Sequence, residues 1–224
     1  MVNISLISTL VKKEFIEVIR DKSLGASLFS ILLFMGIFLF TTRERPSYLM
    51  NTFIPYISLI IGLIVGFSLS NSIVREKREG VIETILCSPM KLKELWLGKT
   101  LSISIMSAVI AVLSTCIILM LNNYEPDLTM IFYILFTVPF FILACIGLLS
   151  LIYFYLGMRQ IQIANYILFI SIFLILFTIL KINITTEITW RTINIITSFS
   201  VTTFIITFYI IDYADIEKIV LTLE

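Results

Sequence analysis

The sequence predicts an all-α integral membrane protein, organised as a single transmembrane domain over residues 1–224. Two observations lead to this class. First, 59% of the residues are hydrophobic and only 14% are charged, which makes the chain far more apolar than a soluble domain of this size. Second, uncharged apolar runs recur that are long enough to cross the ~30 Å hydrocarbon core of a bilayer as helices.

Six such runs are expected to be transmembrane helices, at 24–41, 53–73, 101–121, 128–156, 161–180 and 193–211. The fourth contains Pro139 and Gly147, so we expect it to be bent or to be broken into two shorter helices. No Asp, Glu, Lys or Arg lies within these six spans, which argues against a proton-driven carrier or a channel with a charged filter. A mainly hydrophobic or amphiphilic substrate fits such spans better.

Lysine and arginine are distributed unevenly between the connections of the six spans. Twelve of the sixteen fall on one side of the predicted topology, and the other four are Arg43, Arg45, Lys181 and Arg191. Basic residues accumulate in cytoplasmic connections. We therefore expect a multi-pass protein of the cell's plasma membrane, with both termini, the charged segment 74–99 and the tail 212–224 in the cytoplasm.

Residues 4–22 are too charged to span a membrane, but their apolar residues recur at helical spacing. We expect an amphipathic helix that lies along the inner membrane surface. Glu14 projects within its apolar arc and is expected to meet a protein group instead of lipid. A simple anchor, whose basic face touches anionic head groups, is the alternative. The residues assigned to this interfacial helix are Lys12, Lys13, Glu14, Phe15 and Arg20.

The charged segment 74–99 is much longer than a turn between two spans requires. Arg75 to Leu86 has a helical pattern, with an apolar stripe and a separate row of glutamates. Ser88 and Pro89 suit the N-cap and first position of a second helix, which would run from Met90 to Lys99. The segment is therefore expected to be a helix-turn-helix elbow, solvated at the cytoplasmic face.

The segment ends in Gly98-Lys99-Thr100, which looks like the end of a phosphate-binding loop. That loop requires a glycine five residues before its second glycine and a strand ahead of it. Position 93 is a lysine and no strand is predicted before it, so we expect no nucleotide site here. The chain has no histidine, and its three cysteines lack metal-ligand spacing, so neither catalytic nor metal-binding residues are expected.

The stretch EKREGVIETILCSPMKLKELWLGK resembles the cytoplasmic loop of the type 2 ATP-binding-cassette (ABC) permeases. The N-terminal LVKKEFIEVIRDK is similar to the interfacial connecting helix of that family. With six spans and cytoplasmic termini, the resemblance covers nearly the whole chain. The positions that match the loop pattern are Glu76, Glu79, Gly80, Glu83, Leu86, Pro89, Gly98 and Lys99.

The resemblance implies the transmembrane subunit of an ABC-type exporter, with no ATPase activity and no cofactor of its own. Separate nucleotide-binding subunits would bind ATP and Mg²⁺ and dock on the coupling elbow, and a second permease copy or paralogue would complete the pathway in the lipid bilayer. The near balance of basic and acidic residues gives no reason to expect a nucleic-acid partner. The residues assigned to ATPase coupling are Glu76, Glu79, Gly80, Glu83, Leu86 and Pro89.

Small and polar residues inside the spans have an ordinary structural interpretation. Ser58, Gly62, Gly66 and Ser70 repeat every four residues in the second span and predict a ridge for close helix packing. Gln160, Gln162 and Asn165, near the inner end of the fifth span, fit either a cavity or hydrogen bonds to a neighbouring helix.

Two other functions remain compatible with this pattern, and a third is not supported by it. The membrane subunit of haem-export systems for cytochrome maturation has similar length and layout. A membrane scaffold or assembly factor without transport activity is also compatible with the sequence. An intramembrane hydrolase or transferase would require histidine, paired carboxylates or a Ser/Lys site at membrane depth, and the sequence shows none. The pattern leaves open the substrate, the transport direction and the choice between a homodimer and a heterodimer.

Overall fold

The computed structural model describes residues 4–20, 25, 29, 31, 32, 36, 47–86, 91–122, 125–157, 160, 161, 163–167, 170, 171, 174 and 189–213. All regular secondary structure in these residues is helical, which confirms the all-α class. Four helical stretches are long and apolar enough to cross a membrane, at Tyr56–Arg78, Leu92–Leu121, Leu128–Tyr155 and Trp190–Tyr213. They correspond to the second, third, fourth and sixth predicted spans. The first and fifth predicted spans, 24–41 and 161–180, fall largely outside the described residues.

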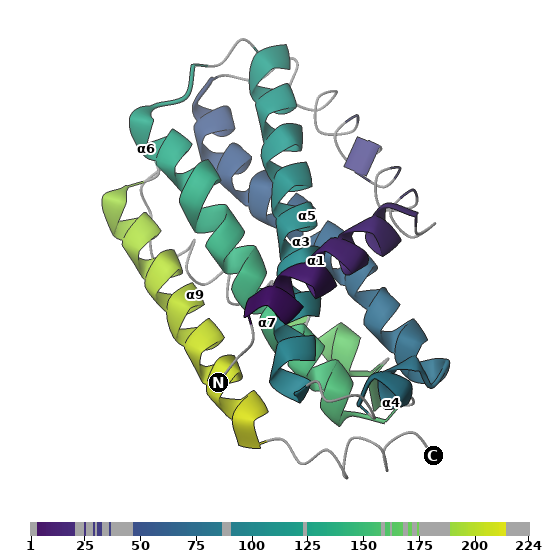
Figure 1. Cartoon of the computed structure of the whole chain (residues 1–224). Helices are drawn as coiled ribbons and strands as arrows, with labels where there is room; N and C mark the ends of the chain where they lie inside the picture. The colour runs from purple at the N-terminus through teal and green to yellow at the C-terminus, as the bar shows by residue number, and fades with distance from the viewer. Residues whose placement is uncertain are drawn as a thin grey trace.

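Three long helices form the centre of the bundle (Figure 1). Helix α3 (Ser47–Arg78) packs against both α5 (Leu92–Leu121) and α7 (Val138–Tyr155), and α5 also packs against α7. Helix α9 (Trp190–Ile210) lies along α7 at the edge of the bundle and ends in the 3₁₀ turn η2 (Ile211–Tyr213). Helix α1 (Ile4–Arg20) crosses α5 obliquely instead of running parallel to it.

The fourth span is one continuous helical path with a local change of pitch. It begins as α6 (Leu128–Phe132), passes through a π-helical turn η1 (Tyr133–Thr137) and continues as α7. Pro139 lies two residues after the end of this turn. In a regular α-helix its ring would collide with the carbonyl of Leu135, and it has no N–H to donate to that carbonyl. The wider turn, in which the N–H of Val138 donates to the carbonyl of Tyr133, accommodates the proline without dividing the span.

Small residues of α3 lie where the three central helices meet. Ser58 and Ser70 are fully buried. A Cβ atom placed on Gly66 would lie only 2.8 Å from Cδ1 of Ile146 in α7 and 3.4 Å from Oγ of Ser107 in α5. Gly62 likewise faces Ile142 and Ala111 on the same two helices. The Ser58–Gly62–Gly66–Ser70 ridge therefore lies at the contacts of α3 with both neighbours.

The charged segment differs from the expected elbow. Helix α3 continues to Arg78, and the chain then turns at Glu79–Gly80 into the short helix α4 (Val81–Leu86). The expectation of one helix from Arg75 to Leu86 is wrong because Gly80 adopts a φ of +72°, which is outside the α-helical region. The expectation of a separate short helix from Met90 to Lys99 is also wrong, since α5 runs without a break from Leu92 to Leu121. Ser88 and Pro89 lie outside the described residues.

Candidate functional site at the charged end of the bundle

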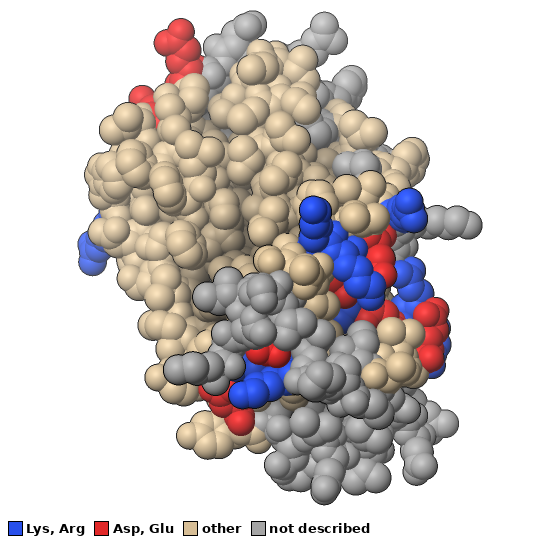
Figure 2. All heavy atoms as spheres, in the orientation of Figure 1, with Lys and Arg blue, Asp and Glu red and all other residues tan. Residues whose placement is uncertain are grey.

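Most charged side chains of the described residues gather at one end of the bundle, which we call the charged end. It consists of α1, the last turns of α3, helix α4 and the first turns of α5, and the turn η2 lies beside it. Figure 2 shows Lys, Arg, Asp and Glu side chains over the lower part of one face, whereas the upper part of that face is almost entirely uncharged. The opposite end carries Glu125 and Asp127, in the connection between α5 and α6.

Lys99, in the third turn of α5, links three helices at this end. Its Nζ donates to Oε1 of Glu14 in α1 at 2.9 Å and to Oε2 of Glu76 in α3 at 2.5 Å. The exposed fractions of the three side chains are 0% for Lys99, 3% for Glu14 and 12% for Glu76. The ammonium group therefore joins α1, α3 and α5 in a site that is largely closed to water. The expectation that Glu14 meets a protein group is therefore confirmed, and its partner is Lys99.

The Lys99 network has an excess of negative charge, because one ammonium group faces two carboxylates. The half-exposed pair of Lys13 and Glu17 lies beside it, with Nζ and Oε1 3.2 Å apart. Partial burial by itself lowers the pKa of Lys13, but the hydrogen bond and charge of Glu17, with the charges of Glu14 and Glu76, raise this pKa above its usual value. The cluster thus holds a nearby ammonium group in its charged form.

Carboxylate oxygens of Glu14, Glu17 and Glu76 lie within 4.8 Å of one another, a spacing that a metal ion would tolerate. Lys99 already places a positive charge on two of the three carboxylates. We therefore assign no metal to this cluster and interpret it as a structural ion network.

The expectation that the whole segment is solvated is wrong, and three of its charged residues are buried. Lys77, Glu94 and Lys99 are buried to 2%, 3% and 0% exposure. Lys77 Nζ donates to the backbone carbonyls of Tyr153, Phe154 and Leu156 at 3.2, 3.1 and 2.8 Å. It therefore caps the end of α7, whose last carbonyls have no partners within the helix. Burial is tolerated because each charge meets an opposite charge or backbone dipoles.

The burial of Lys77 was not predicted, because its charge alone does not distinguish it from the exposed Arg75 and Arg78 beside it. A helical wheel of residues 69–78 would have found the signal. Lys77 follows the buried Leu69, Ser70 and Ile73 at helical spacing, so it lies on the inward face of α3.

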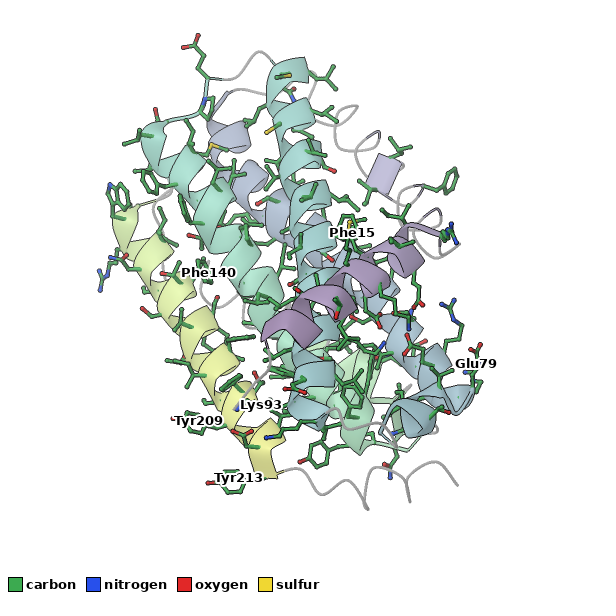
Figure 3. All side chains as sticks on the ribbon, viewed as in Figure 1. Phe15, Glu79, Lys93, Phe140, Tyr209 and Tyr213 are labelled. Carbon is green, nitrogen blue, oxygen red and sulfur yellow. The ribbon has the colours of Figure 1, made fainter. Side chains whose placement is uncertain are left out.

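The turn that follows α3 presents an exposed tip. Glu79 is exposed and points away from the bundle (Figure 3). Gly80 is half-buried, and its left-handed conformation allows the chain to reverse direction there. Of the other residues assigned to coupling, Glu83 and Leu86 belong to α4, but the structure does not describe their side chains, and Pro89 lies outside the described residues.

Helix α1 approaches α5 very closely at Gly98. A Cβ atom on this residue would lie 3.2 Å from Cβ of Leu10, so the glycine allows the Leu10 side chain to pack directly against the backbone of α5. Leu10 and Glu14 form the buried side of α1, Phe15 is half-buried, and Lys12, Lys13 and Arg20 are exposed. The packing of Leu10 on Gly98 and the ion pair at Lys99 thus hold α1 against the start of α5.

Two of the three polar residues predicted near the fifth span are described. Oδ1 of Asn165 accepts a hydrogen bond from the hydroxyl of Tyr153 in α7 at 2.6 Å. Oε1 of Gln160 accepts one from the N–H of Gly157 at 3.4 Å. Of the two possibilities, a hydrogen bond to a neighbouring helix applies to Asn165, while Gln162 lies outside the described residues.

Comparison with protein-family models decides the family. A model described as ABC-2 type transporter matches residues 5–197. The chain belongs to the ABC-2 type transporter family. The matched region includes nearly all of α1, the whole of α3, α4, α5 and α7, and the start of α9, so this ABC-2 protein is the membrane component of an ABC-type transporter. No curated protein and no solved structure matches the chain.

Proposed function

We propose that this ABC-2 protein is the permease subunit of an ABC exporter, and that a separate ATPase docks on its charged end and drives it. The charged end would face the cytoplasm, as the distribution of lysine and arginine predicts. ATP and Mg²⁺ would be bound by the partner subunit. A second permease, either another copy or a paralogue, would complete the pathway.

One observation supports this proposal most strongly: the exposed tip at Glu79 is joined through a short helical segment to the Lys99 network. Glu79 is three residues beyond Glu76, less than one helical turn, and Glu76 pairs with Lys99 at 2.5 Å. A partner that pushes on the tip would therefore act on α3, α5 and α1 together. A floppy loop would absorb such a displacement, whereas packed helices move as units.

The composition of the spans supports a lipophilic or amphiphilic cargo. Between Tyr56 and Val74, and throughout 101–122, 128–157 and 192–211, the chain has no Asp, Glu, Lys or Arg. Ionisable groups at membrane depth are the usual basis of proton relays and ion sites. The described spans therefore carry no ionisable groups that could couple transport to a proton gradient. This favours a partner that hydrolyses ATP as the source of energy.

The proposal is tested by purifying the tagged chain from its native membrane and measuring ATP hydrolysis by the purified material. We expect an ATPase to copurify in stoichiometric amount, and its hydrolysis to become uncoupled from transport when the permease carries Glu79→Lys. A matched variant at the opposite end, Glu125→Gln, should leave the coupling unchanged. Purification of a stable assembly that contains no ATPase would refute the proposal.

A further inference from the structure

We propose that Lys93 is a positioning residue that latches the coupling region to the last span, α9. This inference rests on the proposed function, because it identifies the span to which the displacement of the charged end is passed. The latch consists of Lys93 in the first turn of α5, Phe208 near the end of α9, and Asp212 in the turn η2. The sequence does not predict the pairing of Lys93 with Asp212, because both residues lie in segments that are expected to be solvated.

The geometry of Lys93 is specific to these two partners. Its Nζ lies 2.5 Å from Oδ2 of Asp212 and 3.6 Å from the centroid of the Phe208 ring. Figure 3 shows Lys93 beside the end of α9, where Tyr209 and Tyr213 point outward. One ammonium group thus forms an ion pair and a cation–π contact with two residues four positions apart, on one side of the helix end.

A second contact, which is buried, lies about one turn further along α5. Trp96 is fully buried and stacks on Phe204 of α9 with ring centroids 5.9 Å apart. Its indole N–H donates to the carbonyl of Gly147 in α7 at 3.1 Å. The indole is therefore fixed to α7 while its ring face supports α9. This arrangement makes Trp96 a pivot beneath the end of α9.

The two contacts differ in how easily they can be broken. Separating Trp96 from Phe204 would expose two aromatic surfaces and leave a well-packed site empty. The latch is partly open to water, with 15% of the Lys93 side chain and 47% of the Asp212 side chain exposed. Water can replace the partners of such a pair at little net cost in free energy. The end of α9 can therefore be released at Lys93 while it remains supported at Trp96.

Helix α9 is suited to move because it is the least enclosed of the four described spans. Only 22% of its most apolar 18-residue stretch is buried, against 44–61% of the corresponding stretches in the other three spans. Exposed aromatic residues mark both of its ends, Trp190 at one and Tyr209 and Tyr213 at the other, about 30 Å apart along the helix. These residues place the latch at the level of the membrane surface, where the coupling region meets the span.

The sequence of events follows from this placement. A partner that displaces the charged end moves the first turn of α5, which carries Lys93. The ammonium group leaves Asp212 and Phe208, and the end of α9 tilts about Trp96. Release of the partner restores the contact. Lys93 acts here through α9 and touches no substrate.

The test uses the permease together with its copurified ATPase in nanodiscs, with Cys87, Cys116 and Cys145 replaced by serine. Spin labels are placed at the exposed positions Lys91 and Tyr213, which flank the latch without forming it. Distances between the labels are measured by double electron–electron resonance without nucleotide and with ATP and vanadate. We expect a distance that lengthens by several ångströms on trapping with vanadate.

Two variants of one residue distinguish a latch from a merely structural contact. Lys93→Met removes the charge and should shift the nucleotide-free distances toward the vanadate-trapped ones. Lys93→Arg retains both the ion pair and the cation–π contact, and should behave like the unsubstituted chain. ATP hydrolysis by the Lys93→Met complex is measured alongside the distances, to show that the ATPase is still bound.

Each outcome decides the matter. Identical distances with and without nucleotide, in a complex that hydrolyses ATP, would overturn the latch and leave the proposed function standing. A nucleotide-dependent change that is the same in Lys93→Met would overturn the role of Lys93. If no ATPase accompanies the permease, both the latch and the proposed function fall together.

Discussion

Two ion-pair sites lie six residues apart on α5, and they differ in almost every physical respect. At Lys99 the ammonium group is fully buried and faces two nearly buried carboxylates from α1 and α3. At Lys93 it is partly exposed and faces one half-exposed carboxylate beside α9. Burial makes the first site costly to break, and solvation makes the second cheap to break. The comparison indicates that α1, α3 and α5 move as one unit, while α9 can move separately.

The largest effect is expected from Lys99→Met, which breaks the fixed site. Glu14 and Glu76 would be left buried without a counter-ion, at a cost of about 3–5 kcal/mol in the free energy of unfolding. The midpoint of thermal unfolding in detergent measures this loss. The triple variant with Glu14→Gln and Glu76→Gln should recover much of it, because the uncompensated charges are gone. An unchanged midpoint for Lys99→Met would show that the network does not hold the helices together.

Lys77→Met extends the comparison to the buried cap on α7. Three backbone carbonyls would lose their donor, which should cost about 1–3 kcal/mol in unfolding free energy. Arg78→Met is the matched control, since Arg78 is the adjacent basic residue and its side chain is exposed. Thermal unfolding should separate the two variants clearly. Equal midpoints would contradict the assignment of Lys77 as the cap.

A smaller effect is expected from Gly80→Ala at the exposed tip. No atom lies within 4 Å of the position that the new Cβ would take, so only the positive φ opposes the change. That strain is about 1–2 kcal/mol. Gly80→Asn should be better tolerated, because asparagine adopts the left-handed region more readily. If alanine and asparagine destabilise the protein equally, the turn is not the source of the effect.

Lys93→Met should have little effect on stability, about 1 kcal/mol or less, because its partner is half-exposed. This is the sharpest contrast with Lys99→Met, which removes the same charge from the same helix. Chemical unfolding of the two variants side by side measures the difference. A loss at Lys93 as large as that at Lys99 would remove the distinction between a fixed and a breakable site.

Glu79→Lys should not change stability measurably, since the side chain is exposed and points away from the bundle. Under the proposed function it should nevertheless uncouple ATP hydrolysis from transport, because it reverses the charge at the docking tip. Membrane insertion and the unfolding midpoint serve as controls. Unchanged coupling in this variant would show that the tip is not where the partner acts.

Much of the fold follows from composition and periodicity. Long uncharged runs predicted the helical membrane class, and four of them are helices of sufficient length in the part of the chain that the structure describes. The apolar arc of the N-terminal segment predicted a protein partner for Glu14, and Lys99 is that partner. The pattern of a single helix cannot predict which residue is the partner, because the two residues are 85 positions apart in the sequence.

The charged end was harder to predict than the spans. Sequence patterns treat each charge as solvated unless an opposite charge lies nearby in the chain. Lys77 is paired with carbonyls that only the packing of α3 against α7 brings close, and Lys93 with a carboxylate beyond the end of α9. The break at Gly80 was missed because glycine in a helical pattern is compatible with either a helix or a turn.

Site-specific photo-crosslinking tests the central claim most directly, namely that the charged end receives the ATPase. A photoreactive amino acid would be placed at Glu79 on the exposed tip, or at Glu125 at the opposite end as the matched control. We predict a crosslink to the copurified ATPase from position 79 and none from position 125. A crosslink from position 125 alone, or equal crosslinking from both, would contradict the account.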